Sequence, residues 1–199
     1  VMSENKLLYK KMPLEELVVL SQKEDYKALE ELIKKIQSDV FATLSYLLKS
    51  SENLSDLTQE ILLKVAKNIQ NLKNPKCFKS WLNQIVTHTY YDYIRKKKNA
   101  PETISIDYTC EPLNFALKIE IPDKKTKPIE KCITSECEKM IKSAIRELPE
   151  AFRIAIILRE FQGLSYEEIA KTTSSSIGTV KSRISRARIK LQEALKNYI

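Results

Sequence analysis

Glycine is almost absent from this chain, with only two glycines among 199 residues. β-Hairpins and other tight turns commonly need glycine, because it adopts positive φ angles at no steric cost. Helices joined by short breaks need far less of it. Apolar residues also recur three or four positions apart over residues 24–49, namely at Leu29, Leu32, Ile33, Ile36, Val40, Leu44 and Leu47. This spacing places them on one helical face, so we expect an all-α protein.

Prolines and polar breaks divide the chain into two helical blocks. The first spans residues 1–98, with helices expected at 24–49, 55–71 and 78–98, and the second spans residues 138–199, with helices expected at 138–146, 150–161, 164–170 and 177–197. Between them, residues 99–137 contain four prolines and an alternating apolar run at Leu113, Phe115, Leu117, Ile119 and Ile121. Alternation favours extended chain. We predict two small helical domains joined by a flexible linker.

Charge is distributed unevenly along the chain. The net charge is +8, yet residues 99–138 hold eight acidic residues against five lysines. The two helical blocks are therefore more basic than the chain as a whole. Clustered cations bind polyanions by displacing phosphate counterions, which favours nucleic acid over a membrane surface. The alternative interpretation is a lysine-rich, solvated surface.

Several classes of function lack support in the sequence. Four cysteines, at Cys77, Cys110, Cys132 and Cys137, have no metal-ligand spacing, and the single histidine lies far from the last three. We find no paired nucleophile and base and no glycine-rich phosphate loop, so we expect no metal, no cofactor and no enzyme. A signal peptide and a membrane-spanning apolar run are also not recognisable, so we expect a cytoplasmic protein without membrane insertion.

The second block contains the pattern of a helix-turn-helix. Ser165 and Glu168 predict a capping box, Gly163 is placed to end the preceding helix, and a polar turn follows at residues 172–176. In the last helix one side is apolar, and Ser182 and Arg186 point away from it with Thr179 and Ser185 beside them. Residues 176–192 contain no acid and five basic residues, Lys181, Arg183, Arg186, Arg188 and Lys190. Such a face fits the DNA major groove. The alternative is a basic surface helix in a bundle.

The helix expected at 78–98 carries a different polar face. Leu82, Ile85, Thr89 and Tyr93 form its inner side. Opposite them is a stripe whose members are Gln84, Thr87, His88, Tyr91 and Arg95, followed by Lys96 and Lys97. Amides and rings beside cations suit single-stranded DNA, whose bases stack and whose phosphates need neutralising. A mixed stripe of this kind is also typical of a solvent-facing surface.

The helix expected at 55–71 begins with acidic residues. Glu52, Asp56 and Glu60 occur without a lysine or arginine among residues 52–60, and Ser55 is placed to cap the helix. An acidic start is favoured by the helix dipole, and it would also suit a positively charged protein partner.

Taken together, these motifs resemble a known family. Residues 56–60 (Asp-Leu-Thr-Gln-Glu), 80–82 (Ser-Trp-Leu), Ile85 and 92–95 (Asp-Tyr-Ile-Arg) resemble region two of bacterial sigma factors. Residues 164–170, 178–183 and 186–188 resemble region four, although Ser174 and Ser176 stand in the turn where relatives often have glycine and proline. Two such regions joined by a short linker resemble the extracytoplasmic-function (ECF) group of the sigma-70 family.

The resemblance implies an alternative sigma factor that binds core RNA polymerase and directs promoter-specific transcription initiation. Region two would recognise and melt the minus-ten element, and region four would bind the minus-thirty-five element. Polymerase contacts are expected at the clamp helices of the largest subunit and at the flap, with the clamp contacted by Asp56, Leu57, Gln59 and Glu60. An anti-sigma factor is a further expected partner.

The same resemblance assigns residues to DNA. The minus-ten residues would be Asn71, Asn74, Lys76, Gln84, Thr87, His88, Tyr91, Asp92, Arg95, Lys96 and Lys97. The minus-thirty-five residues would be Thr179, Lys181, Ser182, Arg183, Ser185 and Arg186. Two other interpretations predict different behaviour. A stand-alone helix-turn-helix regulator would bind duplex DNA without polymerase, and a helical adaptor protein would not associate with polymerase at all.

Overall fold

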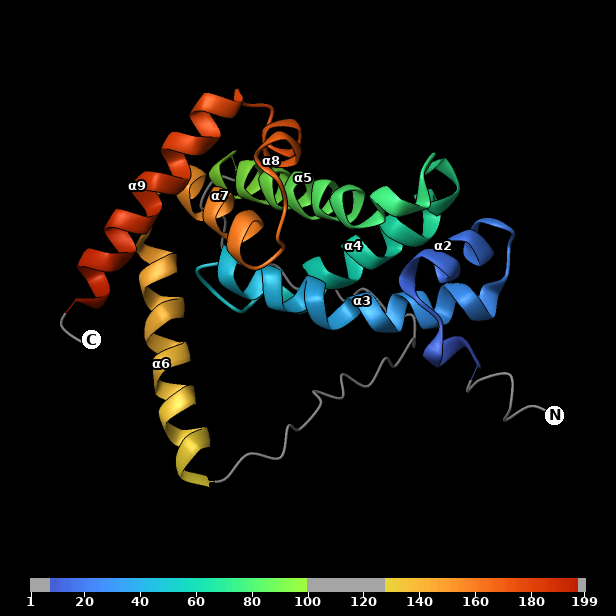
Figure 1. The fold of residues 1–199 in the computed structure, drawn as a ribbon, viewed down its shortest axis with the longest axis horizontal. Coiled ribbons are helices and arrows are strands. Elements are labelled where there is room, and N and C mark those ends of the chain that lie inside the picture. Colours follow the sequence, from blue (N-terminus) through green and yellow to red (C-terminus); the bar gives the residue numbers. More distant parts are fainter. Residues whose placement is uncertain (1–7, 100–127, 197–199) are drawn as a thin grey trace.

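A computed structural model describes residues 8–99 and 128–196 (Figure 1). All regular elements in these two ranges are helices, which confirms the predicted all-α class. The alternating run at residues 113–121, predicted to be extended, lies outside the described residues.

The first bundle consists of α2 (Leu14–Gln22), α3 (Tyr26–Leu47), α4 (Leu54–Asn68) and α5 (Phe78–Asn99). Its core is built from the apolar faces of these helices and includes Leu32, Val40, Ile61, Val65 and Tyr90. The side chain of Asp25 caps α3 by accepting hydrogen bonds from the backbone N–H groups of residues 27 and 28. The long helix expected at 24–49 is therefore present, with the cap fixing its start.

A short irregular segment connects α4 to α5 through two 3₁₀ turns, η1 (Ile69–Asn71) and η2 (Pro75–Cys77). Asn74 caps the second turn by accepting from the backbone N–H of Lys76 at 3.0 Å. The side chain of Gln22 donates to the carbonyl oxygens of Ile69 (3.0 Å) and Leu72 (2.6 Å). These bonds fix the segment against α2.

The second bundle consists of α6 (Pro128–Glu147), α7 (Glu150–Glu160), α8 (Tyr166–Thr172) and α9 (Ile177–Leu195). Its buried residues include Ile145, Ile154, Ile157, Ile169 and Ile184. Gly163 follows α7 with a φ of 68°, the left-handed conformation predicted for a helix-ending glycine.

Two predictions about helix starts are wrong. Helix α6 begins at Pro128, so residues 128–137 are helical and not irregular. Helix α4 begins at Leu54 with Asn53 at the capping position, so Ser55 lies inside the first turn and does not cap it. The Asn53 amide donates instead to the hydroxyl of Tyr93 (3.1 Å), which ties the start of α4 to α5.

The two bundles pack against each other. Helix α8 lies beside α5, and α6 and α7 contact α3 (Figure 1). The buried contact between the Arg153 guanidinium and the Tyr90 hydroxyl, at 3.2 Å, joins α7 to α5. The described residues thus form one packed body in which the two bundles share an interface.

Candidate nucleic-acid interfaces

Helices α8 and α9 form the predicted helix-turn-helix. Ser165 Oγ accepts from the backbone N–H of Glu168 at 3.2 Å, and Glu168 Oε2 accepts from the backbone N–H of Ser165 at 2.8 Å, so the predicted capping box is confirmed. The bond from the Ser165 backbone is the main cause that lowers the pKa of Glu168. Ile169 of α8 and Val180 and Ile184 of α9 are buried. The two helices therefore share one core.

The turn between these helices is shaped by serines. Ser174 has a φ of 48°, a left-handed conformation that is strained for a residue with a Cβ atom. Ser176 Oγ accepts from the backbone N–H of Thr179 at 3.1 Å and so caps α9. The serines at positions 174 and 176 therefore form this turn without glycine or proline.

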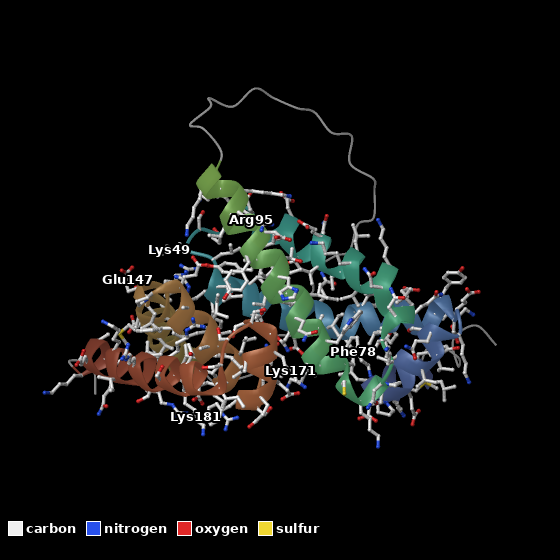
Figure 2. All side chains as sticks on the ribbon, turned by 90° about the horizontal axis from the view of Figure 1, so that it is seen from above. Lys49, Phe78, Arg95, Glu147, Lys171 and Lys181 are labelled. Carbon is white, nitrogen blue, oxygen red and sulfur yellow. The ribbon has the colours of Figure 1, made fainter. Side chains whose placement is uncertain are left out.

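Helix α9 presents a polar outer face. Lys181, Ser182, Ser185 and Arg186 are exposed, and Figure 2 shows Lys181 on the side of α9 turned away from α5. Thr179 is half-buried. Together they offer two cations and three hydroxyls to a groove, which is the face that the sequence predicted.

Arg183 differs from the other predicted residues of α9. It is half-buried, and its Nη1 donates to Ser175 Oγ at 2.8 Å, so it braces the turn. Arg188 is also engaged, because its Nη2 lies 2.6 Å from Glu160 Oε1 of α7. Among the predicted residues of α9, Lys181 and Arg186 are therefore the exposed cations.

Helix α5 presents a narrower polar strip than the sequence suggested. His88, Arg95, Lys96 and Lys97 are exposed, while Gln84, Tyr91 and Asp92 are half-buried. Arg95 Nη2 lies 2.7 Å from Asp92 Oδ1. The predicted residues of the connecting segment, Asn71, Asn74 and Lys76, are all exposed near the opposite end of the helix.

The inner side of α5 is only partly as predicted. Leu82 and Thr89 are buried, but Ile85 and Tyr93 are half-buried, and Val86 and Tyr90 fill the core in their place. Thr87 was expected on the open stripe, yet only 1% of its surface is exposed. In this structure Thr87 is therefore not open to DNA.

Helix α4 presents the acidic face. Asp56, Gln59 and Glu60 are exposed as expected for a docking surface, whereas Leu57 is 5% exposed and belongs to the core. Leu57 therefore supports the helix and cannot contact a partner directly. Leu63, which the sequence pattern did not single out, is 59% exposed and lies seven residues from Asp56, on the same helical face.

Within residues 8–99 and 128–196, no three or more His, Cys, Asp or Glu side chains are grouped so that they could hold a metal ion. In the same ranges, no helix has the length and apolar character required to cross a bilayer.

Comparison with known proteins matches both bundles to one family. The family model described as Sigma-70 region 2 matches residues 32–100, and the one described as Sigma-70, region 4 matches residues 138–191. Together the two matches cover more than half of the chain. The chain therefore belongs to the sigma-70 family.

Similar proteins carry the same family name. The chain is 36% identical over 132 residues to the RNA polymerase sigma-H factor of Pseudomonas aeruginosa, covering 63% of this chain and 64% of that one. It is 36% identical over 133 residues to the ECF RNA polymerase sigma-E factor of Escherichia coli K12, covering 65% of this chain and 64% of that one. The match thus spans just under two thirds of each relative's length.

Solved structures show a similar fold. The sigma factor RpoE of Bartonella quintana, determined in complex with the anti-sigma factor NepR, has a TM-score of 0.63 at 25% identity, over 85% of this chain and 98% of that one. CnrH, in complex with the cytosolic domain of CnrY, has a TM-score of 0.61 at 17% identity, over 92% of this chain and 97% of that one. The fold seen here is therefore shared with a solved sigma factor and with CnrH.

Proposed function

We propose that the chain is an alternative, ECF-type sigma factor that binds core RNA polymerase in the cytoplasm and directs it to particular promoters. The observation that carries this proposal is that each family region ends in a cationic helix with exposed polar side chains, α5 in region two and α9 in region four. A stand-alone helix-turn-helix regulator would need only the cationic helix of region four, α9. The presence of a cationic helix in each region supports a protein that holds two DNA elements at once.

Region four would bind the minus-thirty-five element as duplex. The outer face of α9 would enter the major groove, with Arg186 reading base edges and Lys181 neutralising phosphate. Ser182 and Ser185 lie between them on the exposed face and can donate or accept. No covalent step is required of any of these residues.

Region two would hold the melted minus-ten element. Exposed His88 and half-buried Gln84 and Tyr91 offer hydrogen bonds and a stacking surface, and the cations at the end of α5 would contact phosphates. Extruding a base costs a few kcal/mol in lost stacking and pairing. Contacts to the extruded base would offset that cost, which is how binding alone can favour an open promoter.

The acidic face of α4, made of Asp56, Gln59 and Glu60, would dock on the basic clamp helices of the largest polymerase subunit, and region four on the flap. Exposed Leu63 extends this face by one turn and adds an apolar contact at its edge. RpoE of Bartonella quintana was solved with the anti-sigma factor NepR, which supports an anti-sigma factor as a further partner of this chain.

The test of this function is association with bacterial core polymerase. In purified protein, Asp56→Ala combined with Glu60→Ala should weaken binding to core polymerase by about tenfold or more, because the basic clamp helices would lose both carboxylate partners. The matched control is Glu15→Ala with Glu16→Ala, which removes the same charge from exposed positions on α2. Equal binding of both variants would reject the α4 surface, and no binding by the unaltered chain would reject the sigma function.

A further inference from the structure

Glu60, one of the two carboxylates on the proposed docking surface of α4, is already paired within the chain. Lys64 Nζ, one helical turn further along α4, lies 2.7 Å from Glu60 Oε1. Asp56, on the same face, has no ion pair among the residues that the structure describes. The two carboxylates proposed to meet polymerase are therefore not equivalent.

A second contact fixes the Lys64 ammonium. Lys64 Nζ also donates to Thr89 Oγ1 of the neighbouring helix α5 at 3.0 Å, and Thr89 is 2% exposed (Figure 1). The lysine of an ordinary i,i+4 pair on a helix surface moves among many rotamers, which is one reason why such pairs contribute little. A bond to a buried hydroxyl on another helix restricts these rotamers. The ammonium is thereby held beside Glu60.

A pair of the same spacing on α3 provides a comparison. Lys34 pairs with Glu30, and these side chains are 37% and 57% exposed, against 38% and 46% for Lys64 and Glu60. The two pairs are thus similarly open to solvent. Lys64 differs from Lys34 because it also bonds to a second helix.

The fixed ammonium places a positive charge where a cationic partner would have to approach. A polymerase arginine or lysine that binds Glu60 would share the carboxylate with Lys64, and two cations beside one carboxylate repel each other. Salt screens this repulsion less where the two surfaces exclude water. Part of the attraction of Glu60 for a basic partner is therefore cancelled by a residue of its own helix.

The same contact has an effect of opposite sign on docking. By holding Glu60 in one orientation, Lys64 reduces the side-chain entropy that docking would otherwise remove. Glu60 remains exposed, however, and a single ion pair orders an exposed side chain weakly, whereas the charge of Lys64 acts in every rotamer. We therefore expect the repulsion to exceed the gain from ordering.

We propose that Lys64 attenuates the docking of α4 on core RNA polymerase by competing with the basic clamp helices for Glu60. This inference rests on the proposed sigma function and concerns the regulation of the same docking surface. By mass action, the chain needs a higher concentration to occupy half of the core enzyme than its acidic face alone would require.

Neutral substitutions at Lys64 test the attenuation. Lys64→Met removes the ammonium and keeps an unbranched side chain, and it should tighten binding to core polymerase by about threefold to tenfold, with the larger gain at low ionic strength. The measurement is competition of each unlabelled variant against the labelled, unaltered chain for core polymerase. A residue that only supported the fold or oriented Glu60 would show the opposite sign, so weaker binding of the variant would overturn the proposal.

Two further variants exclude trivial causes of tighter binding. Lys64→Gln keeps a donor for Thr89 without the charge, and its binding should change in the same direction as that of Lys64→Met. Lys34→Met breaks the matched pair on α3 and removes the same charge, and it should change the affinity by less than about 1.5-fold. An equal gain in Lys34→Met would mean that only net charge matters, which would overturn the competition.

A double-substitution cycle assigns the gain to Glu60. In a chain that already carries Glu60→Gln, Lys64→Met should give no further gain, because no carboxylate remains for two cations to share. A gain of full size in that background would reject Glu60 as the shared group. Absence of any gain while the unaltered chain still binds core polymerase would overturn the attenuation alone, whereas failure of the unaltered chain to bind would contradict the sigma function and the attenuation together.

Discussion

Helices α5 and α9 carry the two candidate DNA surfaces, but they are packed in opposite ways. Helix α9 is buried along one side, at Val180, Ile184 and Ala187, and its polar face is open. Helix α5 contacts its own bundle on one side and the second bundle on another, and a narrow strip of the helix around His88 is exposed to solvent. The polar face of α9 is therefore open along its length, whereas α5 combines exposed polar residues such as His88 with buried Thr87 and half-buried Tyr91.

The strongest test of one-sided packing concerns Ile184, which is 1% exposed. Ile184→Ala should lower the free energy of unfolding by about 2–4 kcal/mol, because it leaves a cavity between α9 and its bundle. Ser182→Ala, on the opposite face of the same helix, should change it by less than about 0.5 kcal/mol. Urea unfolding of both variants measures the difference, and similar losses would mean that α9 is covered on both sides.

The next effect concerns DNA. Arg186→Ala should weaken binding to the minus-thirty-five element by about 1–3 kcal/mol and leave minus-ten recognition little changed. Lys196→Ala removes one exposed cation near the end of the same helix and serves as the control. Footprinting of both promoter elements with the polymerase complex would measure this. An equal loss at both elements would show that α9 is not the recognition helix.

A smaller effect is expected in the turn before α9. Ser174→Gly should raise the stability of the protein by about 0.5–1 kcal/mol, because glycine adopts a φ of 48° without strain. Ser175→Gly next to it, at a position without a positive φ, should destabilise the turn and release Arg183. Thermal unfolding compares the two. A loss of stability in both would argue that Ser174 is not strained.

The smallest effect is a dependence on pH. The pKa of Glu168 is lower in the folded protein than in the unfolded chain, chiefly because the backbone N–H of Ser165 donates to it. Its stabilisation is therefore present above the ordinary glutamate pKa and is lost as the pH falls through the lowered value. Glu168→Gln should flatten the acid side of the stability curve. The matched control is Glu167→Gln, at an exposed position, which should leave the dependence of stability on pH unchanged.

Much of the fold followed from local patterns. The capping box at Ser165, the left-handed Gly163 and the apolar face of α9 were predicted because each depends on neighbouring residues alone. The start of α4 was missed because Ser55 and Asn53 are both good capping residues and spacing alone does not choose between them. In the structure Asn53 precedes the helix without a capping hydrogen bond, and its side chain donates to Tyr93, forty residues away.

The candidate site was predictable only where the helices face solvent. Lys181, Ser185 and Arg186 are exposed as expected, but Thr87 and Leu57 are not. On α5, Ser80, Asn83 and Thr87 lie on one side of the helix, and Asn83 bonds to Gln162 of the second bundle. Polar residues of this kind have the same composition whether they meet water or a polar interface. The contact between the two bundles therefore could not be inferred from spacing, because no apolar pattern distinguishes it.

The two hydrogen bonds from Gln22 to the carbonyl oxygens of Ile69 and Leu72 have a consequence for ligand binding. They immobilise the backbone that leads from α4 into α5 during folding, before any nucleotide reaches it. The entropy of ordering that backbone is thus lost once, when the protein folds. Under the proposed function, a nucleotide bound at this segment would meet a backbone that is already ordered, and little of its binding free energy would be spent on ordering the chain.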